Sequence, residues 1–155
     1  MSGCRLTCTV PVEHETSLSS ARSASLRTTE SAAIAIRTFF RIAAEWDLTV
    51  QDLQALLRVG RTTFLRWQQG RYEAGLTPAV LERLSHVFGI YKSLQILLPV
   101  RERSNAWIRQ PNDGPLFRGE PALQRMLRGP AENLAVVRAY LDAQCGGGFP
   151  TSDLI

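Results

Sequence analysis

The chain has 155 residues, of which 45% are hydrophobic, enough for one compact domain or two small helical domains that share a core. No apolar run approaches the roughly 18 residues that span a bilayer. The first ten residues contain one arginine with no apolar stretch after it, unlike a secretory signal. We therefore expect a cytoplasmic protein without a membrane span.

The three cysteines, Cys4, Cys8 and Cys145, are too few and too scattered for a disulfide framework. Cys4, Cys8 and His14 would begin a metal site, but the fourth ligand is missing and the surroundings are rich in Ser and Thr. We expect no bound metal and no cofactor.

The formal net charge is +4, and Lys92 is the only lysine, so nearly all of the positive charge is arginine. Arginine makes bidentate contacts with phosphates, guanine edges and carboxylates. The charge therefore permits nucleic-acid binding, although a GC-rich genome would produce the same bias.

Residues 1–31 are rich in Ser, Thr and Arg and lack a sustained apolar period, which predicts a flexible N-terminal arm. Apolar residues then recur at helical spacing, which predicts an amphipathic helix from Ala32 to about Trp46. Asp47 ends this helix, and Thr49 is an N-cap for a short second helix.

The inner face of that second helix is Leu53, Leu56 and Leu57. Gly60 marks a turn, and a third helix follows that ends at Gly70. Thr77 and Pro78 begin a long helix, with a bend at Gly89 as an option.

Prolines and glycines divide the rest of the chain. A helix that contains Trp107 ends before Pro111, and residues 112–115 form a turn. Residues 121–127 and 130–143 form the last two helices, and no segment has the alternation of a strand. The residues expected to face inward are Leu81, Leu84, Phe88, Tyr91 and Leu94 in the long helix, and Leu134, Val137, Tyr140 and Leu141 in the last one. The predicted fold class is all-α.

Residues 53–70 have the layout of a helix-turn-helix, in which Phe64 and Trp67 anchor the second helix inward. The opposite face of that helix would enter a major groove. The residues that we expect to contact DNA bases or phosphates are Arg61, Thr62, Leu65, Arg66, Gln68 and Gln69. The alternative is an ordinary helical hairpin with solvated arginines.

This stretch resembles the helix-turn-helix of lambda-repressor and Xre proteins, which often carry a small-x-x-Thr-x-x-Arg-Trp run. Two positions depart from that pattern. Arg58 stands where the family prefers Gly at the turn, which costs energy if the backbone there is left-handed. Gln54 stands where the first helix usually has Ala. These departures allow a remodelled turn or a motif that serves dimer packing.

The C-terminal half carries an ordered series of residues, each of which alone would be explained as a core or turn residue. The series is Trp107, Pro111, Asn112, Phe117, Gly119, Pro121, Leu123, Met126, Leu127, Gly129, Leu134, Val137, Leu141 and Gly146. Its order resembles the toxin-binding domain of the Xre/MbcA/ParS antitoxin family, in which a tryptophan helix runs into a Pro-Asn turn, a Phe-x-Gly-x-x-Pro step and two closing helices. The resemblance covers roughly residues 52–147.

Members of this family are usually encoded beside a RES-domain toxin, an enzyme that depletes NAD, and they obstruct its active site. The resemblance implies a helix-turn-helix and dimerisation region at 32–98, a toxin-binding domain at 99–147 and a tail at 148–155. It implies an antitoxin that binds the neighbouring RES toxin and represses its own operon as a homodimer on operator DNA. The residues it assigns to toxin binding are Arg118, Arg125, Arg128, Arg138, Asp142, Gln144 and Gly146.

The sequence shows no recognisable set of catalytic residues. His14 falls in the arm and His86 on a helix, and neither has a Ser-His-Asp arrangement or a carboxylate pair around it. The glycine run at 146–148 lacks the strand and helix that flank a phosphate loop. We expect no enzymatic activity. The alternative functions are a stand-alone helix-turn-helix regulator whose C-terminal half dimerises, and an adaptor that has lost DNA binding.

Overall fold

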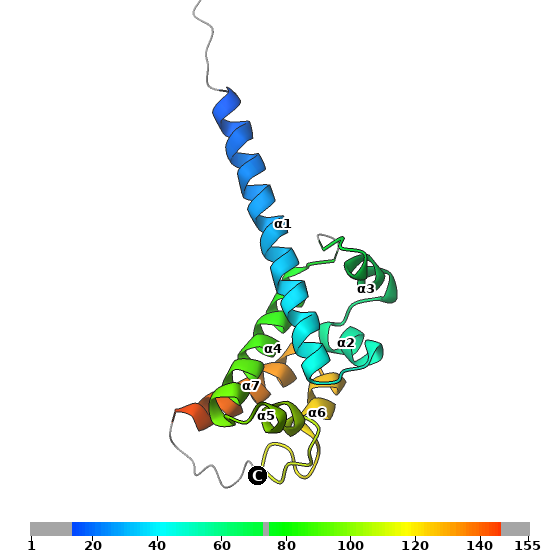
Figure 1. Ribbon diagram of the computed structural model, residues 1–155, viewed down its shortest axis with the longest axis vertical. Helices are drawn as coiled ribbons and strands as arrows, with labels where there is room; N and C mark the ends of the chain where they lie inside the picture. The colour runs from blue at the N-terminus through cyan, green and yellow to red at the C-terminus, as the bar shows by residue number, and fades with distance from the viewer. Residues whose placement is uncertain (1–13, 73–74, 147–155) are drawn as a thin grey trace, which may run out of the picture.

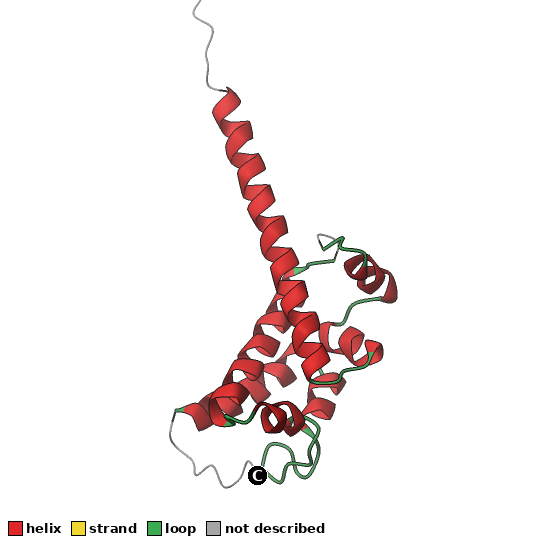
Figure 2. Ribbon diagram, in the orientation of Figure 1, coloured by secondary structure: helices red, strands yellow, loops and turns green. Residues whose placement is uncertain are grey.

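The computed structural model describes residues 14–72 and 75–146, with side chains from Thr29 onward within these ranges. This described part contains seven α-helices and no strand (Figures 1 and 2). The helices are α1 (His14–Glu45), α2 (Val50–Leu57), α3 (Arg61–Gln68), α4 (Pro78–Leu97), α5 (Arg101–Trp107), α6 (Ala122–Arg128) and α7 (Ala131–Cys145). The predicted all-α class is confirmed.

Helix α1 begins at His14 and not at Ala32, so residues 14–31 of the predicted arm are helical. Figure 1 shows the N-terminal half of α1 projecting away from the other helices. A helical segment that projects from the core needs no apolar stripe. It also contains no Gly or Pro that would end it. Residues 1–13, with Cys4 and Cys8, and residues 147–155 lie outside the described residues.

The predicted caps of α2 and α4 are confirmed. The hydroxyl of Thr49 accepts a hydrogen bond from the backbone N–H of Asp52, and the Asp52 carboxylate accepts one from the backbone N–H of Thr49. Thr77 caps α4 through the N–H of Val80, and Pro78 occupies the first turn. These capping contacts satisfy N–H groups that have no partner inside the helix.

Helix α4 is the central element: it packs along α7 and also contacts α1, α2 and α5. Its buried stripe includes Val80, Leu84 and Leu94. Leu81, which the sequence placed inward, is 47% exposed because Val80 takes the buried position beside it. The helix runs without interruption through Gly89, where a Cβ atom would lie 2.4 Å from Nε of Arg138. Gly89 therefore makes room for a side chain of α7.

One connected core extends from α1 to α7. At its C-terminal end Phe117 contacts the rings of Trp107 and Tyr140 edge-on, with ring centroids 5.7 and 5.1 Å apart. Such edge-to-face contacts orient aromatic rings. They fix the long connection between α5 and α6, whose two ends meet at a bridge between Pro111 and Pro121.

Candidate functional site

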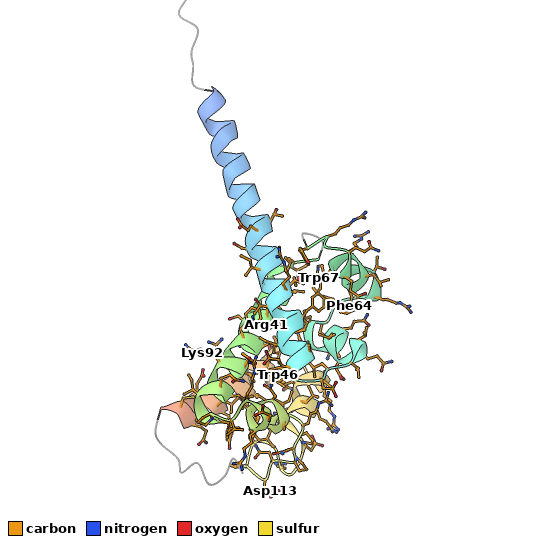
Figure 3. The ribbon with its side chains drawn as sticks, in the orientation of Figure 1. Arg41, Trp46, Phe64, Trp67, Lys92 and Asp113 are labelled. Carbon is orange, nitrogen blue, oxygen red and sulfur yellow. The ribbon has the colours of Figure 1, made fainter. Side chains whose placement is uncertain are left out.

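The first part of the candidate site is the α2–α3 unit. Leu53, Leu56 and Leu57 of α2 are buried, as predicted. On α3, Phe64 and Trp67 are 3% and 1% exposed, and they lie between α3 and α1 in Figure 3. The ring of Phe64 meets Phe40 of α1 edge-on at 5.7 Å. Two aromatic side chains thus anchor α3, while its other face is turned to solvent.

The turn between these helices contains Arg58 in the left-handed conformation, with φ 54° and ψ 42°. This is the position for which the resemblance predicts glycine. Its backbone N–H and that of Val59 both donate to the carbonyl of Gln54. The turn therefore has the left-handed geometry that glycine would favour. With an arginine at this position, the left-handed backbone is energetically unfavourable.

All of the residues that the sequence assigned to DNA contact are exposed. They are Arg61, Thr62, Leu65, Arg66, Gln68 and Gln69. They come from α3 and the residue after it. Thr62, Leu65, Arg66 and Gln69 lie on the side away from the buried Phe64 and Trp67, whereas Gln68 lies beside them. The structure thus brings two arginines, several hydrogen-bonding groups and one exposed leucine to one short helix.

The predicted toxin-binding residues form two groups with different surroundings. The first group surrounds the α5–α6 connection. Arg118 is exposed there, in a left-handed conformation with φ 53°. Arg125 donates to the carbonyl of Leu116, at 3.1 Å. Nη1 of Arg128 donates to both carboxylate oxygens of Glu120, at 2.9 and 3.0 Å. Arg118 and Arg125 also help to line a pocket of about 570 Å³.

The second group lies on α7 and is partly occupied by contacts with α4. Arg138 donates to the carbonyl of Ser85 at 3.3 Å, and its Nε lies 3.5 Å from the carboxylate of Asp142. That carboxylate accepts a hydrogen bond from the Ser93 hydroxyl at 2.7 Å. Gln144 is half-buried near the end of α7, and Gly146 follows the helix in an exposed position. Arg138 and Asp142 thus also join α7 to α4.

Sequence reasoning missed Arg83, a buried arginine on α4 that is 6% exposed. Its guanidinium donates to the carbonyls of Leu56, at 2.9 Å, and Gly129, at 3.2 Å. Burial lowers the pKa of Arg83, and the positive charge of Arg58 lowers it further. An arginine in an amphipathic helix is normally solvated, so no local signal identified this one.

Sequence reasoning also missed the role of the Arg58 side chain. It donates to the carbonyl of Gly129 at 3.2 Å and to that of Arg128 at 3.4 Å. Arg58 was singled out only as an unfavourable turn residue. The contact joins positions about 70 residues apart, which only the tertiary fold brings together.

Neither a metal-type cluster of His, Cys, Asp and Glu nor a helix long and apolar enough to cross a membrane occurs in the described ranges.

Residues 25–89 match the family described as the antitoxin Xre-like helix-turn-helix domain. A Sinorhizobium fredii protein with the name "Uncharacterized protein y4oB" is 46% identical to the chain over 114 residues, which is 72% of this chain and 84% of that protein. No solved structure matches the chain significantly. The chain belongs to one family with the Sinorhizobium fredii protein, and its residues 25–89 are an Xre-like helix-turn-helix domain of the antitoxin type.

Proposed function

We propose that the chain is a non-catalytic antitoxin that blocks a RES-type toxin encoded beside it and represses its own operon through α3. The observation that carries this proposal is the exposed face of α3 within a domain of the antitoxin Xre-like family. The C-terminal series of residues that resembles the toxin-binding domain of Xre/MbcA/ParS antitoxins supports the second role.

For DNA, α3 enters the major groove with its exposed face. In this proposal Arg66 makes a bidentate contact with guanine, Leu65 an apolar contact with a thymine methyl, and Arg61 a phosphate contact. A homodimer presents two copies of α3 to half-sites about 34 Å apart, one turn of the duplex.

For the toxin, the surface is formed by the α5–α6 connection, α6 and the exposed side of α7. Arg118 is exposed. Arg128 exchanges Glu120 for a toxin carboxylate or enters the complex as a pair with it. Arg125, Arg138, Asp142, Gln144 and Gly146 complete the proposed surface.

The test is expression of the adjacent reading frame under tight control, with and without this chain, while growth and total NAD are measured. We expect the neighbour alone to arrest growth and deplete NAD, and co-expression of this chain to restore both. A harmless neighbour, or toxicity that this chain does not change, contradicts the antitoxin role and favours the stand-alone regulator.

The division of labour is tested with two variants and one control. Arg66→Ala should weaken binding to the promoter duplex about tenfold and leave neutralisation intact. Arg118→Asn, which keeps a residue that tolerates left-handed backbone, should weaken neutralisation and leave operator binding intact. Arg103→Ala, an exposed position on α5, should change neither. Loss of toxin binding in Arg66→Ala would contradict the assignment of the two surfaces.

A further inference from the structure

The regions that carry the two proposed surfaces are joined at one backbone carbonyl, that of Gly129 between α6 and α7. It accepts a hydrogen bond from Arg58, the turn residue that precedes α3, and another from Arg83 of α4. The neighbouring carbonyl of Arg128 also accepts from Arg58. We call these four residues (Arg58, Arg83, Arg128 and Gly129) the arginine clamp.

The hydrogen bonds of the clamp go to carbonyls at helix ends and not to carboxylates, although the negative charges of Glu132 and Glu82 also favour the charged form of Arg83. Among the described residues Arg83 forms no salt bridge, although it is buried. Its guanidinium instead bridges the carbonyl of Leu56, in the last turn of α2, and the carbonyl that follows α6. The C-terminal end of a helix carries partial negative charge and unpaired carbonyls. Two helix ends therefore compensate a buried cation, and the compensation depends on their relative position.

The α6–α7 side of the clamp has little freedom to adjust. A Cβ atom on Gly129 would lie 1.7 Å from Nδ2 of Asn133, which donates to the carbonyl of Arg125 at 3.1 Å. The carbonyls at the end of α6 are thus held by Asn133, Arg58 and Arg83. A displacement of this turn has to move Arg58 or break its hydrogen bonds.

We propose that Arg58 and Arg83 are positioning residues that couple operator binding to toxin binding. This inference rests on the proposed function. Arg128 presents its side chain on the proposed toxin surface and its carbonyl to Arg58, so a toxin that shifts the α6–α7 turn also shifts the turn before α3. Packed elements pass such shifts on because the buried guanidinium of Arg83, which bridges two carbonyls, has few alternative arrangements.

The experiment measures the affinity of the chain for its own promoter duplex, with and without saturating toxin from the adjacent reading frame. The ratio of the two affinities is the coupling factor. For the natural sequence we expect about fivefold or more. In Arg58→Gly the ratio should fall toward one, while the left-handed turn is kept because glycine favours it.

The matched control is Asp47→Gly, because Asp47 also has a positive φ, 51°, and lies outside the clamp. This variant should keep the natural coupling factor. Arg83→Lys, which keeps a charge but not the fork that bridges two carbonyls, should also lower the ratio. Thermal unfolding of each variant shows whether it folds. If Arg83→Lys does not fold, the measurement on Arg58→Gly alone tests the inference.

The outcomes separate the two proposals. If the natural chain binds promoter and toxin but its coupling factor is one, the coupling is overturned and the proposed function stands. If Arg58→Gly keeps the full coupling factor, the assignment to the clamp is overturned. If the natural chain binds neither promoter nor toxin, the proposed function fails first and the inference fails with it.

Discussion

At the scale of single residues, left-handed backbone occurs at three non-glycine positions of the described chain: Asp47, Arg58 and Arg118. Such a conformation costs about 1 kcal/mol or more relative to glycine. Asp47 is a residue type that tolerates it, and its carbonyl accepts a hydrogen bond from Arg109. Arg58 offsets the cost with two hydrogen bonds that glycine could not make. The departure from the family pattern thus has a structural reason.

Gly129→Ala should destabilise the fold by about 1–3 kcal/mol. Its Cβ atom would collide with Asn133 and displace the amide that caps the carbonyl of Arg125. Urea denaturation measures the loss. Gly146→Ala is the control, because a Cβ atom there would make only ordinary contacts, at 3.5 and 3.7 Å, and φ is −75°. Equal losses in the two variants would show that the close packing at Gly129 is not what matters.

At the scale of elements, the N-terminus of α2 depends on one reciprocal pair of side chain and backbone contacts. Thr49→Ala should therefore cost about 1 kcal/mol of unfolding free energy. Asp52→Ala removes the other half of the pair, so the loss in the double variant should be smaller than the sum of the single losses. Gln51→Ala, at an exposed position of the same helix, should cost nothing. Additive losses at Thr49 and Asp52 would contradict a reciprocal cap.

The helices whose starts were predicted well from the sequence are those preceded by capping or turn residues. Thr49, Thr77 and Pro78 mark the starts of α2 and α4, and Gly60 directly precedes α3. Residues 14–31 of α1 carry no such signal, because a projecting helical segment needs no apolar face. The position of Leu81 was wrong because two adjacent apolar residues both fit a helical period, and only packing decides which of them is buried.

In the candidate site, too, the features set by local sequence patterns were predicted and those set by tertiary contacts were not. The exposed face of α3 followed from the period set by Phe64 and Trp67, since residues opposite a buried stripe face solvent. The contacts of Arg58 and Arg83 with Gly129 did not follow from any local pattern. They join segments about 46 to 71 residues apart, and the chemistry of an arginine does not reveal whether it meets water or a backbone carbonyl.

At the scale of the whole molecule, α4 joins regions that the sequence assigned to different functions. It contacts α1, α2, α5 and α7, and the buried residues of all these helices belong to one core. A shared core favours cooperative unfolding of both regions. It also means that truncation of α7 would expose the core, so point variants are the better test of its surface.

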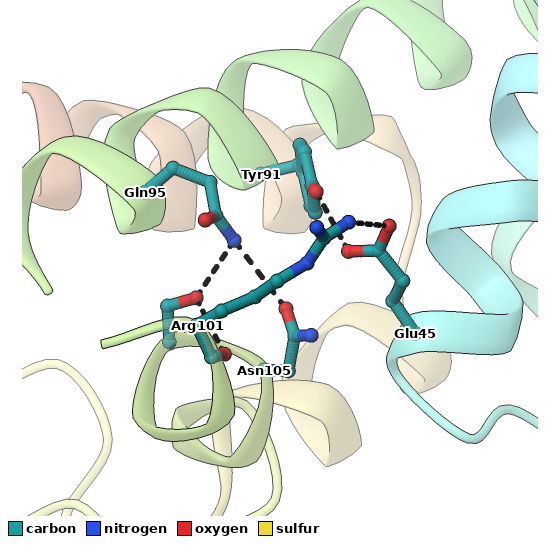
Figure 4. Close-up of polar contacts among 6 residues, drawn as sticks. Glu45, Tyr91, Gln95, Arg101 and Asn105 are labelled. Carbon is teal, nitrogen blue, oxygen red and sulfur yellow. Dashed lines mark hydrogen bonds and ion pairs between the residues drawn. The ribbon is translucent and has the colours of Figure 1, made fainter. Parts of the chain in front are cut away.

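A polar network at the junction of α1, α4 and α5 makes the stability of this core depend on pH (Figure 4). The Glu45 carboxylate accepts hydrogen bonds from the hydroxyl of Tyr91, at 2.7 Å, and from Arg101. Burial raises the pKa of Glu45, but the hydrogen bonds from Tyr91 and Arg101 and the charge of Arg101 outweigh it, so the pKa is lowered from its ordinary value of 4.5. A depressed carboxyl pKa stabilises the fold above the ordinary value, and the stabilisation is lost as the pH falls through the folded-state pKa.

Glu45→Gln should therefore lower the unfolding free energy by about 1–2 kcal/mol at pH 7, and the difference from the natural chain should shrink as the pH falls below about 4.5. Urea denaturation at both pH values measures this difference. Glu102→Gln, at an exposed position of α5, should be neutral at either pH. A loss in Glu45→Gln that stays constant across the pH range would mean that the shape of the side chain, and not its charge, holds α1 to α4 and α5. A loss that disappears in acid would show that the charge of Glu45 holds this junction together.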